Sequence, residues 1–130
     1  MLYVMDASAL LALMQGERGS DVVDTLIVEN ECVASSVNIV EVGTRLVDKG
    51  LAPVHLARTL KQLDVQTIDF DLEQALLSST MRVSTRQAGL SLGDRACLAL
   101  AQLMKGTAVT SDSAWVDVAE AVGVKVLMIR

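Results

Sequence analysis

Four acidic residues of this 130-residue chain lie beside or inside apolar runs, where a carboxylate packs poorly: Asp6, Glu41, Asp94 and Asp112. Glu41 interrupts the apolar run 37–42, and Asp94 precedes the apolar run 96–101. Buried carboxylates lose hydration and repel one another, so they coexist only with shared protons, basic partners or a bound cation. The four positions together therefore indicate a site with chemistry.

Each of the four acids also has an ordinary structural explanation. Asp6 and Asp112 each precede a helical stretch and could cap it. The segment Ser91–Asp94 fits the capping-box pattern, in which the acid reaches back to the cap residue. Glu41 and Arg45 are four residues apart and could form a surface ion pair on a helix. Taken singly, these alternatives remain open.

Clustered carboxylate oxygens favour a hard cation, Mg²⁺ or Mn²⁺. Such a cation can orient a water molecule, lower its pKa and neutralise a phosphate oxygen, which suffices to hydrolyse a phosphodiester. The chain has few residues of the types that other catalytic mechanisms need. His55 is the only histidine and is expected at the surface, and Cys32 and Cys97 lie in apolar runs without metal-site spacing, which predicts buried free thiols.

The composition suits one domain with an aliphatic core. Hydrophobic residues make up 52% of the chain and aromatic residues 2%, which excludes intrinsic disorder and argues against a platform that stacks bases. The net charge of −5 has the wrong sign for a nucleic-acid binder unless metal ions bridge protein and polyanion. The first apolar stretch is interrupted by Asp6 and lacks a basic start, so we expect neither a signal peptide nor a membrane span, and a cytoplasmic protein.

Strand-like and helix-like segments alternate along the chain. The predicted strands are residues 2–5, 32–34, 65–68, 107–110 and 125–129. The predicted helices are residues 9–14, 20–29, 38–49, 53–63, 72–86, 93–104 and 113–121. This alternation predicts an α/β fold whose parallel sheet is covered on both faces, with ligands bound beyond the carboxyl ends of the strands. Asp6 and Asp112 both follow predicted strands.

The four acids lie in four recognisable segments: VMDASALLAL (4–13), SVNIVEV (36–42), LSLGDRACLALA (90–101) and VTSDSAW (109–115). In this order they resemble the motifs of PIN-domain ribonucleases of the VapC type, the toxin half of bacterial toxin–antitoxin pairs. The third segment is the most distinctive. The resemblance spans essentially the whole chain, so residues 1–130 are expected to form a single PIN domain.

The resemblance implies a three-layer α/β/α sandwich with a central parallel sheet of strand order 3-2-1-4-5. It implies Mg²⁺ or Mn²⁺ bound by the same four acids that carry catalysis: Asp6, Glu41, Asp94 and Asp112. It further implies cleavage of single-stranded RNA, a homodimer and a VapB-like antitoxin. Strands 1 and 4 would be neighbours and bring Asp6 and Asp112 together. Strand 3 would lie at an edge and carry Asp71, which the family does not use, away from the site as a plain helix cap.

Some members of the family have a further acid two positions after the last motif Asp, where this chain has Ala114. We therefore expect one well-held ion, with Asp117 as a solvated helix residue. Ser8 and Asn38 could support the site through hydrogen bonds or serve as local caps. One locally basic stretch offers either phosphate contacts or solvated helix faces: Arg82, Arg86, Arg95 and Lys105.

The helical segments 9–14, 22–27 and 56–63 carry more apolar residues than one small sheet needs. We expect these faces to form the homodimer, and residues 10–14 and 56–63 to receive an apolar helix of the antitoxin. An antitoxin Arg or Lys would enter the acidic site and displace the metal.

Two other classes of protein remain as alternatives. A non-catalytic PIN-like module would hold RNA or a protein without cutting, and its signature would be a missing motif carboxylate; none is missing. A receiver-like phosphotransfer domain would need an acidic pair at the first strand and a Lys after the last. Asp6 has no acidic neighbour, and Lys125 precedes the apolar part of its strand.

Overall fold

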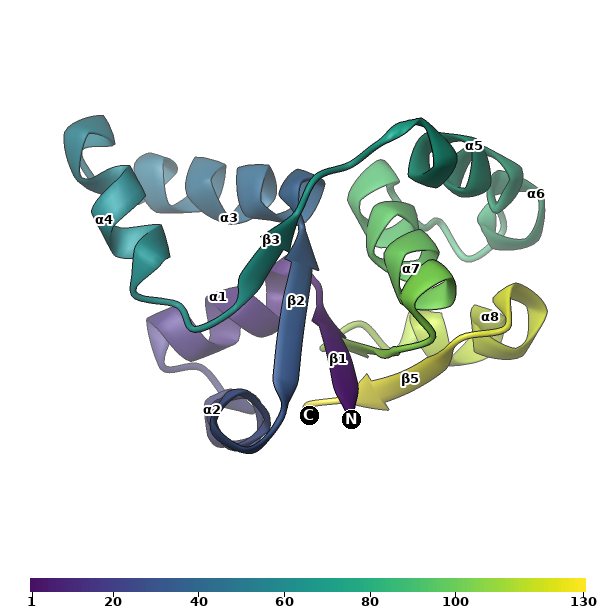
Figure 1. Cartoon of the computed structure of the whole chain (residues 1–130), viewed down its shortest axis with the longest axis horizontal. Coiled ribbons are helices and arrows are strands. Elements are labelled where there is room, and N and C mark those ends of the chain that lie inside the picture. The colour runs from purple at the N-terminus through teal and green to yellow at the C-terminus, as the bar shows by residue number, and fades with distance from the viewer.

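The computed structural model describes all residues, Met1–Arg130, and places five strands in one sheet (Figure 1). The strands are β1 (Leu2–Met5), β2 (Glu31–Ser35), β3 (Gln66–Ile68), β4 (Thr107–Thr110) and β5 (Lys125–Met128). They lie in the order β3-β2-β1-β4-β5, and every neighbouring pair is parallel. The strand order implied by the family resemblance is therefore confirmed.

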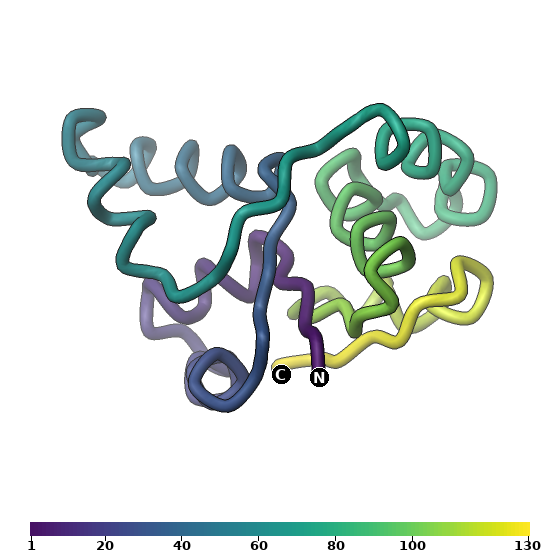
Figure 2. The backbone as a smooth tube through the Cα atoms, viewed as in Figure 1, coloured from purple at the N-terminus to yellow at the C-terminus, as the bar shows by residue number.

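Helices cover both faces of the sheet. They are α1 (Ala7–Gln15), α2 (Ser20–Glu29), α3 (Ser36–Asp48), the 3₁₀ turn η1 (Pro53–His55), α4 (Leu56–Lys61), α5 (Leu72–Thr80), α6 (Arg82–Thr85), α7 (Leu92–Met104) and α8 (Ala114–Val122). After β3 the chain crosses from the side of α3 and α4 to the side of α5 and α7, as the trace in Figure 2 shows.

The core is divided in two by the sheet, because neighbouring residues of a strand point to opposite faces. Val4 packs with Trp115 and the apolar residues of α7 in one cluster. Met5, the next residue along β1, packs with Leu10 of α1 in the other. The sheet is thus buried on both faces, and the predicted three-layer α/β/α sandwich is confirmed.

Three helices begin at polar residues that stand at the carboxyl edge of the sheet. The side chain of Asp6 caps α1, that of Ser35 caps α3, and Ser91 and Asp94 form a reciprocal capping box at α7. Cap residues satisfy the free N–H groups of a first helical turn. The sequence places polar side chains at this edge for structural reasons as well as chemical ones.

The predicted helix over residues 72–86 is interrupted in the structure, where α5 ends at Thr80 and α6 begins at Arg82. Hydroxyl side chains accompany the break. Thr80 Oγ1 donates to Leu77 O at 2.9 Å and Thr85 Oγ1 donates to Met81 O at 2.8 Å. Both carbonyls also accept the helical N–H groups of Met81 and Thr85. A hydroxyl bond added to a helical carbonyl in this way bends the helix.

The apolar faces of α1 and α2 are buried only in part. Leu10, Ala12 and Val23 are fully buried in the core. Other apolar residues of these faces keep part of their surface exposed: Leu11, Leu13, Met14, Val22, Leu26 and Ile27. The expected role of these faces in binding partners stays a prediction. A groove of about 420 Å³ between α3 and α4 adds exposed apolar surface. Its apolar lining is Ile39, Val40, Val47, Leu56 and Leu60.

The expectations for the two cysteines and for His55 are confirmed. Cys32 and Cys97 are buried free thiols, and His55 is exposed. None of the helices combines the length and the hydropathy that crossing a membrane requires.

Candidate active site

The carboxyl ends of β1 and β4 lie side by side, because the two strands pair in parallel with Met5 opposite Val109. Asp6 is the first residue beyond β1, and its backbone N–H donates to Val109 O at 3.1 Å. Thr110 ends β4, and Asp112 follows two residues later. Both acids therefore leave the sheet at the same edge, at the point where the strand order reverses.

The carboxylate of Asp6 is buried, with 4% of the residue exposed, and both of its oxygens accept hydrogen bonds. Oδ1 accepts from Ser8 Oγ at 2.7 Å and from the Ala9 backbone N–H at 2.8 Å. Oδ2 accepts from Thr110 Oγ1 at 2.6 Å, a bond that joins the ends of the two strands. The bond from Ala9 is the expected helix cap, and the three donors together fix the orientation of the carboxylate.

The pKa of Asp6 is raised from 3.8 to about 6, chiefly by burial and to a smaller extent by the negative charge of Asp94. The hydrogen bonds from Thr110, Ser8 and Ala9 act in the opposite direction, because they favour the charged form. Burial is the larger effect. Carboxyl groups whose pKa is displaced towards neutrality are common at functional sites.

Glu41 is held by Asn38, one turn earlier on α3. Asn38 Nδ2 donates to Glu41 Oε1 at 2.8 Å and to Gly93 O at 3.0 Å, whereas the buried Asn38 Oδ1 has no partner. Because the amide donates to two acceptors and leaves its own oxygen unpaired, its orientation is dictated by Glu41 and Gly93. The hydrogen-bond partner of Glu41 is thus Asn38, not Arg45 as the surface-pair alternative required.

Gly93 gives the Glu41 carboxylate the space that it occupies. A Cβ atom built on Gly93 would overlap all three terminal atoms of the Glu41 side chain. Burial raises the pKa of Glu41, the hydrogen bond from Asn38 lowers it, and the charge of Asp94 raises it. The first turn of α7 and the first turns of α3 therefore meet at this carboxylate.

Asp94 carries out the capping role that was the alternative to a functional one. Its Oδ2 accepts from the Ser91 backbone N–H at 2.8 Å, and its own N–H donates to Ser91 Oγ at 3.2 Å. The charge of Asp94 nevertheless raises the pKa of both Asp6 and Glu41. Asp94 therefore acts electrostatically on two of the other three predicted site residues.

Asp112 joins this group through its backbone. Its N–H donates to Thr110 Oγ1 at 3.0 Å, and Thr110 in turn donates to Asp6. The side chain of Asp112 is exposed, and its Oδ1 accepts from the Ala114 N–H at the start of α8. The expected approach of Asp6 and Asp112 is thus mediated by Thr110.

The two acids that were expected to lie outside the site do so. Asp71 follows the edge strand β3 and caps α5, with Oδ1 accepting from the Gln74 N–H at 3.0 Å. Asp117 is exposed in the first turn of α8. The guanidinium of Arg95, a candidate phosphate contact, instead donates to Ser78 O at 3.0 Å and ties α7 to α5.

Two residues of the site were not singled out from the sequence. Thr110 has the β-branched side chain that is ordinary in a strand, and only its position two residues before Asp112 could have pointed to it. Gly93 lies inside the capping-box segment, and its contact with Glu41 comes from packing between α3 and α7. The supporting hydrogen bonds considered for Ser8 and Asn38 are both present.

The chemistry of the donor set fits a hard divalent cation, because the site offers carboxylate oxygens that repel one another. No three His, Cys, Asp or Glu side chains converge closely enough to hold an ion in the present arrangement. Asp94 and Asp112 direct one oxygen each to the backbone of their own helices. The second oxygen of each of these two carboxylates makes no hydrogen bond and is free to turn towards a shared ion.

The raised pKa of Asp6 predicts how stability depends on pH in metal-free protein. Between about pH 4 and pH 6 the folded state holds a proton on Asp6 that the unfolded state has released, so the stability contributed by this group falls as pH rises. The Asp6→Asn variant should be more stable than the parent protein by up to about 3 kcal/mol at pH 7, and the gap should close towards pH 4.

Urea unfolding with EDTA, repeated across this pH range, measures the gap. The matched control is Asp71→Asn, which changes an exposed cap acid and should show no such trend. If Asp6→Asn is no more stable than the parent at pH 7, or if the difference in their free energies of unfolding grows as pH falls, then Asp6 is not a buried carboxylate that is charged at neutral pH.

Comparisons with known proteins agree with this geometry. The PIN-domain family model matches residues 3–121, which is most of the chain and includes all four acids. A comparison with curated protein sequences found no match.

Solved structures of toxin–antitoxin complexes have the same fold. VapBC-1 from nontypeable Haemophilus influenzae has a TM-score of 0.74 at 13% identity, covering 99% of this chain and 98% of that one. A toxin–antitoxin complex from Klebsiella pneumoniae has a TM-score of 0.72 at 22% identity, covering 98% of each chain. DNA-bound VapBC from Salmonella typhimurium has a TM-score of 0.72 at 17% identity, covering 100% of each. These likenesses establish the fold and the family match spans the site, so the chain belongs to the PIN-domain family.

Proposed function

We propose that this protein is a metal-dependent endoribonuclease, the toxin of a toxin–antitoxin pair, which hydrolyses single-stranded RNA. Its catalytic and metal-binding residues are Asp6, Glu41, Asp94 and Asp112. The observation that carries the proposal is that Asp94 lies close enough to raise the pKa of both Asp6, which is buried, and Glu41 at the switch point of the sheet. Membership of the PIN-domain family supports a nuclease role.

The cofactor in this proposal is Mg²⁺ or Mn²⁺, held by the same four acids. When bound, a divalent cation supplies an activated water and neutralises charge on a phosphate oxygen. The repulsion that Asp94 exerts on Asp6 and Glu41 is relieved when a cation lies among them. The same cation lets a protein of net charge −5 approach a polyanion.

The protein's own contribution is to orient the carboxylates before any ligand arrives. Ser8 and Thr110 hold the two oxygens of Asp6, and Asn38 holds one oxygen of Glu41. Partners of this kind raise metal affinity or activity by roughly 10- to 100-fold in other metal sites. The PIN-domain match includes all four acids, and no motif carboxylate is missing, which favours a nuclease over a binding module without catalysis.

Removal of charge tests the catalytic set. Asp6→Asn and Asp94→Asn should each lower the rate of cleavage of a fluorescent single-stranded RNA by roughly a hundredfold or more, since charges that hold a catalytic cation contribute several kcal/mol. The control Asp71→Asn should cleave at the parent rate. Excess EDTA should abolish cleavage by the parent protein, and undiminished cleavage in EDTA would overturn the metal mechanism.

Gly93→Ala tests whether the position of the Glu41 carboxylate matters. The new Cβ displaces the end of a flexible side chain, so stability should change little while cleavage falls by roughly 10- to 100-fold. The matched control is Gly43→Ala, also within a helix, whose Cβ would lie 3.5 Å from Leu56 in ordinary contact. That variant should keep its activity and gain up to about 1 kcal/mol of stability. Equal activity in the two variants would show that Glu41 needs no such placement.

The partners in this proposal are an antitoxin and a second copy of the chain. Antitoxin binding is supported by the solved complexes of the same fold, whose names describe toxin–antitoxin pairs. The groove between α3 and α4 is an open apolar surface that can receive an amphipathic helix. An Arg or Lys carried by the same partner would enter the acidic site beside the start of α3. The homodimer, through the apolar faces named from the sequence, stays a prediction.

A groove variant separates inhibitor binding from catalysis. Val47→Gln places a polar side chain in the groove, and Val83→Gln does the same on the exposed surface of α6. We expect the first to weaken neutralisation by the protein encoded beside this one by roughly tenfold, with RNA cleavage unchanged, and the second to alter neither. Inhibition assays with the purified pair measure this. Equal inhibition of both variants would place the inhibitor elsewhere.

A further inference from the structure

The charges of this acidic protein are segregated. Residues 45–61 contain four Lys or Arg and one acid, so this segment has a net charge of +3. The rest of the chain has a net charge of −8, which gives the protein its total of −5. The four basic residues are Arg45, Lys49, Arg58 and Lys61. We call them the basic tip. They were not singled out from the sequence, because a turn separates the two helices that carry them.

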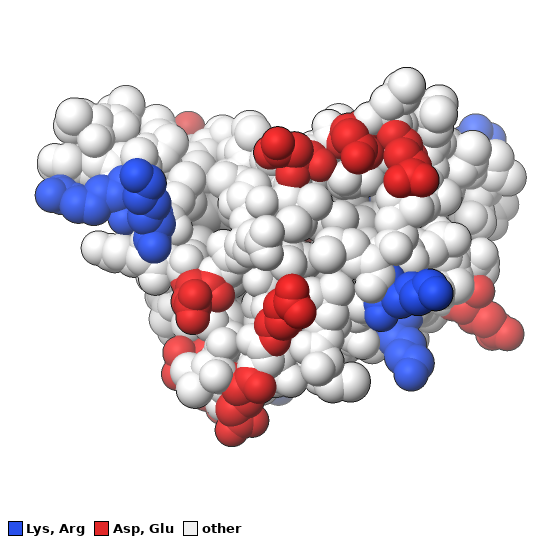
Figure 3. Space-filling model, in the orientation of Figure 1, with Lys and Arg blue, Asp and Glu red and all other residues white.

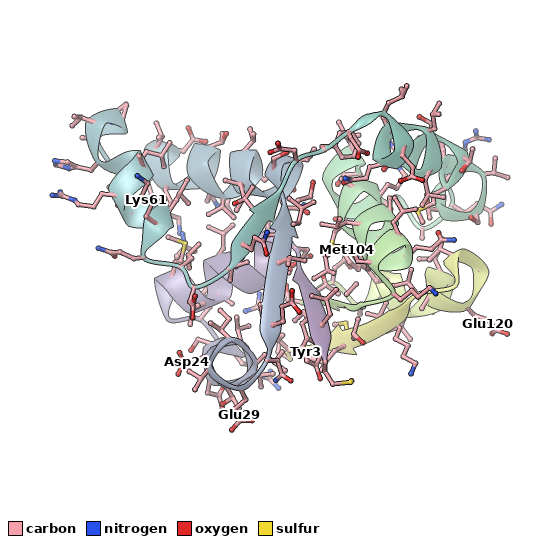
Figure 4. All side chains as sticks on the ribbon, viewed as in Figure 1. Tyr3, Asp24, Glu29, Lys61, Met104 and Glu120 are labelled. Carbon is pink, nitrogen blue, oxygen red and sulfur yellow. The ribbon has the colours of Figure 1, made fainter.

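The fold collects the basic tip at one end of the molecule. Arg45 lies in the last turn of α3 and Lys49 is its C-cap residue. Arg58 and Lys61 belong to α4, which packs beside α3. All four are exposed. Basic side chains gather over α4 in Figure 3, and Lys61 is labelled there in Figure 4. Leu56 and Leu60 of α4 line the apolar groove, so the basic and apolar residues of this helix are separate.

Helix α3 connects the basic tip to the active site. Glu41, Arg45 and Lys49 follow one another at intervals of four residues, which places them along one face of the helix. At 1.5 Å per residue, Glu41 and Lys49 are about 12 Å apart along the axis. A flexible polyanion bound at the basic tip therefore needs only a few of its monomers to reach the carboxylates.

We propose that the basic tip binds the phosphate backbone of single-stranded RNA and holds the strand that enters the carboxylate site. This inference rests on the proposed ribonuclease function. It gives the substrate a cationic surface on a protein whose net charge otherwise repels it.

Nucleic acid fits the tip better than a protein partner does. The inhibitor proposed above carries a cation into the carboxylates, and a cationic segment is repelled by the basic tip. The basic residues first considered for phosphate binding are partly engaged elsewhere: Arg95 donates to Ser78 O, and Arg82 to Leu90 O. The tip side chains have no such bonds in the structure, and so are free to move to phosphates.

Contacts far from the reacting atoms act on binding and not on the chemical step. Removing Arg58 and Lys61 together should therefore raise KM with kcat unchanged. Each lost contact should also lower the dependence of RNA affinity on salt, by about 0.7 in the slope of log K against log salt for a single strand.

The experiment uses a short fluorescent single-stranded RNA of mixed sequence. Its affinity is measured by anisotropy in EDTA over a salt series, and its cleavage is measured separately with Mn²⁺. The test variant is Arg58→Ala with Lys61→Ala. The matched control is Arg18→Ala with Lys125→Ala, which removes the same charge from exposed side chains without hydrogen bonds elsewhere.

We expect the test variant to bind roughly tenfold more weakly at low salt, with a slope reduced by about 1.4, and the control to bind like the parent. Equal losses in both variants would mean that net charge alone acts, and no loss in the test variant would also overturn the proposal. Loss of inhibitor neutralisation with unchanged RNA binding would assign the tip to a protein partner instead. If the parent protein cleaves no RNA with Mn²⁺, the ribonuclease function itself fails, an outcome distinct from these.

Discussion

The carboxylate of Asp6 is buried at the point where β1 gives way to α1, and removing a charge from water is costly wherever it occurs. The shift of its pKa to about 6 corresponds to about 3 kcal/mol at neutral pH. Three donors reduce this cost: the first turn of α1, Ser8 and Thr110. Thr110 can donate only because β4 lies next to β1. The strand order therefore matters to the site, because it brings Thr110 to Asp6 and Ser111 to Ser8.

The same residues serve the fold and the site. Asp6 and Asp94 begin α1 and α7, and their cap bonds stabilise those helices without any ligand. The start of α7 also supplies Gly93, whose missing side chain leaves room for Glu41, and the carbonyl that orients Asn38. Helix starts are places where backbone N–H groups are free and negative charge is favoured. This explains how one edge of a small sheet can hold several acids.

Local patterns and family resemblance contributed different parts of what could be predicted from the sequence. The apolar run Leu2–Met5 and the alternation of segments sufficed for the parallel sheet, but the strand order came from the resemblance. The break at Met81 was missed because hydroxyl groups bend a helix without changing its apolar pattern. Thr110 and Gly93 were missed because their roles depend on contacts across the fold, between segments far apart in the chain. The basic tip was missed for the same reason, since packing of α4 beside α3 brings its charges together.

The central claim is that the carboxylate cluster binds a divalent cation in which Asp6 takes part. Calorimetric titration of metal-free protein with Mn²⁺ at pH 6, in two buffers of different ionisation heat, tests it most directly. Metal binding requires a deprotonated carboxylate, so binding should release about half a proton from Asp6 at this pH, because its pKa is about 6. The release should vanish in Asp6→Asn, together with most of the affinity. Binding that is equally tight without the Asp6 charge, or that releases no proton, would contradict the account.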